Sequence, residues 1–245
     1  MTSKVRLDQL LVARGLVESR AQAQALIVSR RVFTGERCLD KAGQQVNPDL
    51  EVTLRKDEHG FVSRGGTKLA GGLDHFQLDP TGAIALDLGA STGGFTDVLL
   101  QCGARRIYAV DVGYGQLDWR LRNDPRVEVL ERTNARHLTN AEIPDPIDVI
   151  VADTSFISLK LVLPAALALA APKAWLVALI KPQFEVGKGR VGKGGVVRDP
   201  NLHEAVCADI TDWLAAQDWQ VLGVTPSPIT GPKGNREFLI AARKT

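Results

Sequence analysis

Several charged residues stand directly beside short apolar runs of this chain. Asp153 follows the run 147–152, Lys181 follows the run 175–180, and Glu237 opens the run that ends at Ala241. Each run has the length and composition of a buried strand. Ligands of open α/β sheets bind outside the carboxyl ends of the strands, and a final antiparallel strand begins at that same edge. We therefore expect these side chains to face one site, where a lysine and two carboxylates can orient a polar substrate and manage one proton.

A glycine-rich turn predicts a binding site for a nucleotide-like ligand. Residues 83–88 indicate a buried strand, residues 94–101 a helix, and a turn of small residues joins them. Glycine lets the backbone approach a ligand closely because it has no Cβ. Ser91 stands where a pyrophosphate fingerprint needs its second glycine, and Asp87 suits a cationic amino-acid group better than a pyrophosphate. The turn resembles motif I of class I methyltransferases, which implies S-adenosylmethionine contacts at Asp87, Gly89, Ser91, Thr92, Gly93 and Phe95.

A second carboxylate strengthens the prediction of a nucleoside site. Asp111 follows the apolar run 106–110, about 24 residues after Asp87. An acid at this spacing can accept hydrogen bonds from both ribose hydroxyls of a bound nucleoside. The spacing alone does not separate S-adenosylmethionine from NAD. Asn134, just after the run 127–130, resembles the position that meets an adenine ring.

The second part of the chain alternates strand and helix patterns. The predicted strands are 83–88, 106–111, 127–130, 147–153, 175–180, 219–225 and 237–241. This alternation predicts a doubly wound, mainly parallel sheet that is covered by helices on both faces. The apolar region 159–180 contains Pro164, Pro172 and Lys173, so it predicts a helix, a turn and a strand and not a membrane span.

Residues 1–58 differ in character. A short helix from Arg6 toward Gly15 precedes a capping box at Ser19–Gln22, which opens a second helix through Ser29. A turn at 34–36 and a strand at 50–54 follow. This unit resembles the alpha-L (S4-like) RNA-binding motif. Arginine grips phosphate oxygens bidentately, and the resemblance implies an RNA-facing patch of Arg6, Arg20, Arg30 and Arg31.

Taken together, the chain resembles the TlyA/hemolysin A family of ribosomal-RNA 2′-O-methyltransferases. The motifs are S-R-G-G-T-K-L at 63–69, D-L-G-A-S-T-G-G-F-T-D at 87–97, A-D-T-S-F-I-S-L at 152–159, K-P-Q-F-E at 181–185 and G-N-R-E-F at 234–238. The resemblance implies an S4-like domain at 1–58, a linker at 59–62 and an FtsJ-like domain at 63–245 with a seven-stranded class I (Rossmann-like) fold. It implies methyl transfer from S-adenosylmethionine to a ribose 2′-hydroxyl of ribosomal RNA, at a cytidine.

Lys68, Asp153, Lys181 and Glu237 match the K-D-K-E tetrad of FtsJ-like enzymes. The resemblance implies that Lys181 lies nearest the 2′-hydroxyl, as a base or as an electrostatic anchor. Asp153 would orient Lys181 and face the methyl-sulfonium, while Lys68 and Glu237 would position the ribose. Methyl transfer from a sulfonium mainly needs orientation of the reactants and handling of one proton.

Composition limits the alternatives. The chain has 245 residues, 44% of them hydrophobic, and a net charge of +2, so an RNA surface must be a local patch. The cysteines Cys38, Cys102 and Cys207 are scattered, which disfavours a disulfide framework and a zinc site. The polar amino terminus shows no signal peptide. We expect a cytoplasmic protein that binds ribosomal RNA or ribosomal subunits, with no metal, no membrane contact and no obligate protein partner.

Other interpretations explain less of the chain. The stretch 187–194 nearly spells a P-loop, but Gly194 replaces the hydroxyl residue that would hold magnesium. We interpret it as a flexible basic loop beside the site. An NAD-linked oxidoreductase leaves Lys181 and the first domain unexplained, and a pseudouridine synthase needs no S-adenosylmethionine turn. A membrane-active hemolysin is disfavoured because the sequence shows no strongly amphipathic cationic helix. A methyltransferase that acts on another RNA remains as an alternative interpretation.

Overall fold

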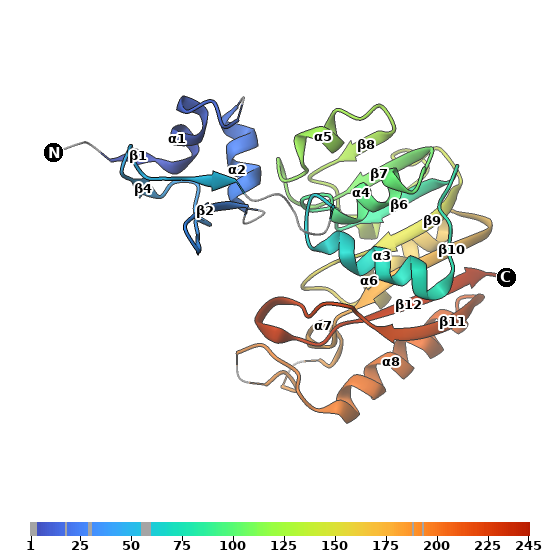
Figure 1. The fold of residues 1–245 in the computed structure, drawn as a ribbon. Coiled ribbons are helices and arrows are strands. Elements are labelled where there is room, and N and C mark those ends of the chain that lie inside the picture. The colour runs from blue at the N-terminus through green and yellow to red at the C-terminus, as the bar shows by residue number, and fades with distance from the viewer. Residues whose placement is uncertain (1–3, 18, 29–30, 55–59, 188, 193) are drawn as a thin grey trace.

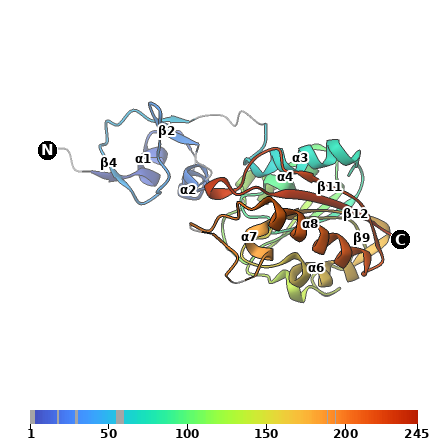
Figure 2. The same ribbon diagram turned by 90° about the horizontal axis from the view of Figure 1, so that it is seen from below.

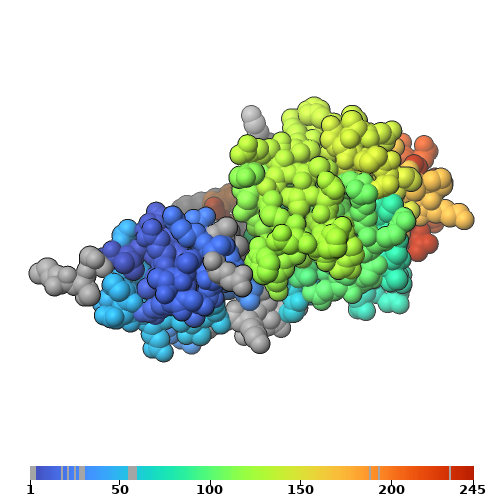
Figure 3. Space-filling view, turned by 90° about the horizontal axis from the view of Figure 1, so that it is seen from above, coloured from blue at the N-terminus to red at the C-terminus, as the bar shows by residue number. Residues whose placement is uncertain are grey.

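The structure is a computed structural model that describes residues 4–17, 19–28, 31–54, 60–187, 189–192 and 194–245. Figure 1 shows a smaller N-terminal part in blue and a larger C-terminal part that runs from cyan to red. In the space-filling view of Figure 3, the N-terminal part forms a lobe beside the larger one. No helix of the described ranges is long and apolar enough to span a membrane.

The N-terminal part packs two helices against short strands. Its elements are β1 (Val5–Arg6), α1 (Leu7–Ala13), α2 (Arg20–Val28), β2 (Val32–Thr34), β3 (Arg37–Cys38), β4 (Gln45–Val46) and β5 (Thr53–Leu54). β1 pairs with β4, and β2 lies between β3 and β5. Leu7, Leu11 and Ile27 are fully buried in a separate apolar core. This core packs α1 and α2 against the short strands, and so the N-terminal part has an apolar interior of its own.

Local signals explain most of these bounds. The backbone N–H of Gln22 donates to Ser19 Oγ over 3.2 Å, as the capping box predicts. The first helix begins at Leu7 and not at Arg6, because Arg6 pairs with Gln45 in the β1–β4 ladder. The predicted strand at 50–54 is confined to β5, because only Thr53 and Leu54 pair with β2.

The C-terminal part is built on one seven-stranded sheet, which confirms the predicted fold class. Its strands lie in the order β11-β12-β10-β9-β6-β7-β8, and β12 runs opposite to the other six strands of this sheet. The strand bounds are β6 (Ile84–Leu88), β7 (Arg106–Val110), β8 (Val127–Leu130), β9 (Ile147–Ala152), β10 (Ala170–Ile180), β11 (Trp219–Pro226) and β12 (Phe238–Lys244).

Helices cover both faces of this sheet. One face packs against α3 (Gly65–Phe76), α4 (Gly94–Gln101) and α5 (Trp119–Arg122), and the other against α6 (Leu159–Ala168) and α8 (Pro200–Ala215). Figure 2 shows α3 and α6 on opposite sides of the strands. Leu86 packs toward α6, whereas Ala85 packs toward α4, because successive strand residues point to opposite faces. Shorter helical turns are η1 (Ala135–His137), α7 (Pro182–Glu185) and η2 (Pro232–Gly234).

The predicted strands of the sheet match closely except at the start of β10 and the end of β12. β10 begins at Ala170 and not at Trp175, and its register against β9 shifts between these two residues. Exposed Pro172 and Lys173 lie inside this irregularity, where a strand tolerates proline. β12 extends to Lys244 because it pairs with both β10 and β11 along its length.

Candidate active site

One cavity of about 810 Å³ lies at the carboxyl edge of the sheet. This volume is in the usual range for small-molecule sites, about 300–1,000 Å³. Its walls come from the segment before α3, the β6–α4 turn and the ends of β9 and β10. The loop that contains Val191 and Gly195 and the segment before β12 complete them. Segments far apart in sequence therefore meet at the edge where the fold class predicts a ligand.

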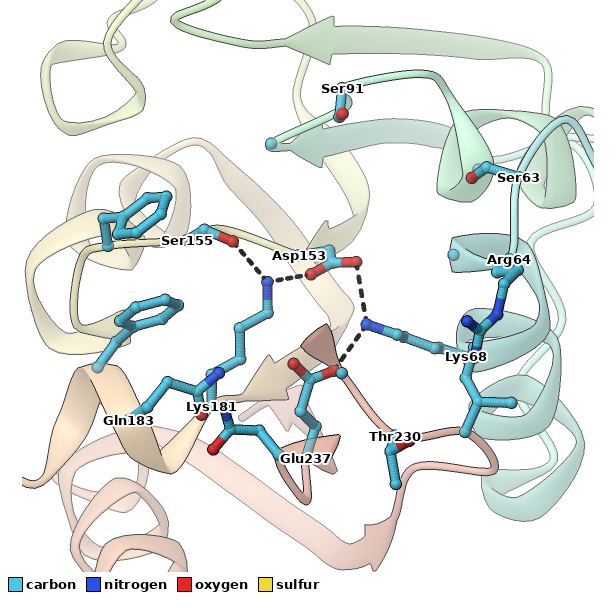
Figure 4. A pocket seen from close by; sticks show the side chains of 18 of the residues that line it. Ser63, Arg64, Lys68, Ser91, Asp153, Ser155, Lys181, Gln183, Thr230 and Glu237 are labelled. Carbon is cyan, nitrogen blue, oxygen red and sulfur yellow. Dashed lines mark hydrogen bonds and ion pairs between the residues drawn. The ribbon is translucent and has the colours of Figure 1, made fainter. Parts of the chain in front are cut away.

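The four tetrad residues form one connected network on the wall of this cavity. Lys68 Nζ donates to Glu237 Oε2 over 2.7 Å and lies 3.7 Å from Asp153 Oδ2. Lys181 Nζ lies 2.5 Å from the other oxygen of the same carboxylate, Asp153 Oδ1. Figure 4 shows Asp153 between the two lysines. The structure thus brings together all four residues that the sequence pattern singled out.

Burial requires the charges of this network to be paired. Lys68 and Lys181 are only 8% and 7% exposed, and Glu237 is 2% exposed. An unpaired charge at such positions costs several kcal/mol, so each must find an opposite partner. Two lysines face two carboxylates, and the formal charges of the network cancel. Removing any one member leaves a buried charge without compensation.

Strand register explains how the network is assembled. Ile180 pairs with Phe238 in the antiparallel β10–β12 ladder, so Lys181 and Glu237 emerge side by side. Asp153 follows β9, which pairs in parallel with β10. Lys68 lies in the first turns of α3, which packs on the same end of the sheet. The sheet therefore fixes three members, and one helix brings the fourth.

Glycines allow the backbone to approach the site from two sides. Gly89 has a φ of +81°, and a Cβ there would lie 2.9 Å from the carbonyl oxygen of Asp153. A Cβ at Gly94 would lie 2.4 Å from Ser63 Oγ and 2.8 Å from the backbone nitrogen of Gly66. The turn after β6 therefore packs directly against the segment that leads into α3, and larger residues would separate the two walls.

Asp87 lies beneath the turn and not on the cavity wall. It is fully buried, and its Oδ2 accepts a hydrogen bond from Thr96 Oγ1 over 2.6 Å. Burial raises the pKa of Asp87 to about 7, although the Thr96 hydrogen bond opposes this rise. Its Oδ1 is buried and has no hydrogen-bond partner among the described residues. The carboxylate therefore keeps an unused acceptor directly below the turn.

Three other expected cofactor residues also lie off the cavity wall. Asp111 accepts backbone N–H groups of Ser91 over 2.8 Å and of Gly113 over 2.7 Å. Asn134 caps η1, accepting from the N–H of Arg136 over 3.1 Å. Gly93 is the N-cap residue that precedes α4, with a φ of +96°. By contrast, the cavity wall includes the expected cofactor residues Gly89, Ser91, Thr92 and Phe95.

Two of the four expected RNA-facing arginines, Arg6 and Arg20, converge on one buried carboxylate. Asp8 is fully buried, and its Oδ2 lies 3.0 Å from Arg6 Nη2 and 2.9 Å from Arg20 Nη2. The Arg6 hydrogen bonds hold the pKa of Asp8 well below its usual range. Arg31 is half-buried just before β2. Arg30 lies outside the described residues.

The glycine-rich stretch forms part of the cavity wall and does not adopt a P-loop arrangement. Val191 and Gly195 line the cavity, and Gly192 bridges to Val196. A P-loop is followed at once by a helix, whereas α8 begins only at Pro200 behind its cap Asp199. Lys188 and Lys193 lie outside the described residues.

Sequence reasoning missed Ser155. Its Oγ accepts a hydrogen bond from Lys181 Nζ over 2.9 Å, and it lines the cavity. Gln183 also lines the cavity, and its Oε1 has no partner among the described residues. Both belong to motifs that the sequence displays, A-D-T-S-F and K-P-Q-F-E. The available signal was their position within two residues of Asp153 and Lys181 at the strand ends.

Comparison with known proteins agrees with this geometry. The FtsJ-like methyltransferase family matches residues 61–244, and the S4 domain family matches residues 5–52. A Mycobacterium tuberculosis protein, 16S/23S rRNA (cytidine-2′-O)-methyltransferase TlyA, is 48% identical over 99% of this chain and 91% of its own length. Hemolysin A of Brachyspira hyodysenteriae is 40% identical over 96% of this chain and 98% of its own length. A solved structure from Streptococcus thermophilus, which carries a provisional hemolysin name, covers this chain completely and 90% of its own chain, with 40% identity and a TM-score of 0.77.

The sheet order and the tetrad define a class I methyltransferase of the FtsJ-like kind, preceded by an S4 domain. The chain belongs to the TlyA/hemolysin A family of FtsJ-like methyltransferases. The cofactor of such enzymes is S-adenosylmethionine, and the residues present fit it. The glycine turn at the cavity wall leaves room for close backbone approach, and acceptors at Asp87 and Gln183 lie unused beside it.

Proposed function

We propose that this protein methylates a ribose 2′-hydroxyl of ribosomal RNA, at a cytidine, with S-adenosylmethionine as the methyl donor. The observation that carries the proposal is the buried Lys68–Asp153–Lys181–Glu237 network on the wall of the cavity that the glycine turn also lines. The named TlyA relative supports the choice of RNA and nucleotide.

The chemistry divides simply between cofactor and protein. S-adenosylmethionine supplies a methyl group on a sulfonium, which is already a good leaving group. The protein must hold the 2′-oxygen in line with that methyl and let the hydroxyl proton leave. We assign cofactor contact to Gly89, Ser91, Thr92 and Phe95, which line the cavity. Gly93 would shape the turn that they form, and its φ of +96° favours glycine there.

Three further residues off the wall retain the capacity to contact the cofactor. A carboxylate offers about four lone-pair sites. Asp111 uses two of them for Ser91 and Gly113, which leaves acceptors for ribose hydroxyls. Asp87 keeps Oδ1 for a cationic amino-acid group. Asn134 must exchange its hydrogen bond to Arg136 before it can meet an adenine ring.

Within the tetrad, we assign Lys181 to the 2′-oxygen. Its ammonium faces the cavity and can stabilise the negative charge that grows on the oxygen as the proton leaves to solvent. Asp153 holds Lys181 by the 2.5 Å ion pair. Lys68 and Glu237 would position the ribose. Glu237 Oε1 is buried without a partner among the described residues, so it offers an acceptor to a ribose hydroxyl.

We propose that RNA capture belongs to an N-terminal domain of residues 1–58, joined by the linker 59–62 to a methyltransferase domain of residues 63–245. Arg6, Arg20 and Arg31, with Arg30, would contact phosphates. The S4 match to residues 5–52 supports this division. A protein that acts on ribosomal RNA must share its compartment, and so we propose a cytoplasmic location.

The test is a methyl-transfer assay with purified ribosomal subunits and methyl-labelled S-adenosylmethionine. We expect label in the RNA with the wild-type protein and none above background with Lys181→Ala. Lys160→Ala is the matched control, because Lys160 pairs with Asp209 outside the cavity. Cofactor binding should persist in both variants. Undiminished transfer by Lys181→Ala would refute the assigned role, and absence of transfer by the wild type to either subunit would refute the substrate.

A further inference from the structure

We propose that Ser155 is a positioning residue that aims the Lys181 ammonium at the reacting hydroxyl, an inference that rests on the proposed function. Lys181 Nζ donates to Ser155 Oγ over 2.9 Å and lies 2.5 Å from Asp153 Oδ1. An ammonium has three N–H groups. One N–H is used by Ser155 Oγ, and the ion pair with Asp153 holds another side of the ammonium, which leaves N–H capacity for a ligand in the cavity that Lys181 lines (Figure 4).

The two lysines of the network differ in a way that this proposal explains. Lys68 Nζ lies between two carboxylates, those of Glu237 and Asp153. Lys181 shares one carboxylate and has a neutral hydroxyl as its second partner. A second carboxylate beside Lys181 would repel a substrate oxygen that is gaining negative charge. A serine hydroxyl fixes the direction of the ammonium without adding that repulsion.

The backbone around Ser155 is built to hold it in place. Phe156 has a φ of +66°, a left-handed conformation that is strained for a bulky side chain. Such strain persists only where the surroundings enforce it and concentrates at functional sites. The conformation belongs to the short connection between β9 and α6, which also carries Asp153.

The far end of this connection is tied to the segment that carries Lys181. Glu185 Oε1 accepts the backbone N–H of Leu159, the first residue of α6, over 2.8 Å. The rings of Phe156 and Phe184 lie 5.1 Å apart. Two further contacts therefore join the Ser155 connection to the Lys181–Glu185 segment beyond the Ser155–Lys181 hydrogen bond, and they help to keep the two side chains in a fixed relation.

The kinetic test compares Ser155→Ala and Ser155→Thr with the wild type. Losing one hydrogen bond to a charged group should lower kcat roughly ten- to hundredfold in Ser155→Ala. KM for RNA, cofactor affinity and the thermal midpoint should stay near wild type. Ser155→Thr retains a hydroxyl and should recover most of kcat. Thr81→Ala, which removes an exposed hydroxyl before β6, is the control.

A second measurement does not depend on turnover. The 15N resonance of the Lys181 ammonium, assigned by its loss in Lys181→Arg, should shift and exchange its protons faster in Ser155→Ala. An unchanged resonance would overturn the proposal, whether or not the wild type methylates ribosomal RNA. Wild-type kcat in Ser155→Ala, or equal impairment of the Ala and Thr variants, would also overturn it. A wild type that transfers no methyl group to ribose would instead refute the proposed function.

Discussion

Lys181 and Glu237 lie beside one another although one residue ends a strand and the other precedes one. Ile180 of β10 pairs with Phe238 of β12, and these strands run in opposite directions. The end of one strand and the start of the other therefore meet at a single edge, with Lys68 bonded to Glu237 and Asp153 bridging both lysines. The one antiparallel strand of the sheet thus completes the charge network.

Charge balance predicts the effect of removing the Glu237 carboxylate. Glu237→Gln keeps the shape of the side chain but leaves the buried network with an excess positive charge. We expect kcat to fall about ten- to hundredfold while cofactor affinity is retained. Glu128→Gln, on the exposed side of β8, is the matched control. Wild-type kcat in Glu237→Gln would contradict the assignment of Glu237 to the site.

Steric contact predicts that Gly231 and Glu237 act as a unit. A Cβ at Gly231 would lie 2.0 Å from Glu237 Oε1. Gly231→Ala should therefore displace the carboxylate and lower kcat by a factor similar to that of Glu237→Gln. The double variant should be little worse than either single variant, because both act on the same side chain. Additive losses in kcat would show that Gly231 acts elsewhere.

Asp8 allows a test in which the direction of the change in RNA affinity decides between two roles for this carboxylate. Its carboxylate pairs with both Arg6 and Arg20, so Asp8→Asn should leave the two guanidinium groups without a fixed orientation. We expect weaker RNA binding, about three- to tenfold in Kd, although the substitution removes a negative charge. Asp49→Asn, an exposed change in the same part of the chain, should strengthen RNA binding or leave it unchanged. Binding isotherms at two salt concentrations, with thermal unfolding as a check on folding, would measure this. Tighter binding by Asp8→Asn would refute the organising role.

The raised pKa of Asp87 predicts a pH-dependent stability. An unfolded aspartic acid titrates near pH 4, whereas folded Asp87 titrates near 7. Between these values the unfolded chain releases the proton and the folded chain keeps it, so folding becomes less favourable as pH rises. Asp87→Asn removes this penalty. Denaturant unfolding without cofactor should show the variant gaining about 2 to 4 kcal/mol on the wild type between pH 4 and 8. If the free energy of unfolding changed with pH in the same way in both proteins, that result would contradict the burial of an ionisable Asp87.

The sequence predicted the sheet well because the signals there are local. Runs such as 84–88 and 147–152 are apolar and bounded by polar turns, and three tetrad residues, Asp153, Lys181 and Glu237, stand directly at strand ends. The alternation of these runs with helical patterns predicted a doubly wound, mainly parallel sheet. These features depend on residues near one another in the chain, and so a single sequence displays them.

Individual side-chain partners were harder to predict because they depend on contacts across the chain. Asp111 stands at the expected strand end, yet its oxygens bind backbone groups 20 and 2 residues away. Asp8 belongs to the polar pattern of a short helix, yet it is fully buried beneath Arg6 and Arg20. Ser155 has no spacing rule of its own, and its role emerges only from the distance to Lys181.

The most direct test of the central claim is the identity of the methylated nucleoside. Ribosomal RNA would be methylated by the wild-type protein, digested to nucleosides and analysed by mass spectrometry beside a Lys181→Ala reaction. We expect 2′-O-methylcytidine in the wild-type sample and its absence in the variant. A nucleoside methylated on its base, or 2′-O-methylcytidine at equal yield in both samples, would contradict it.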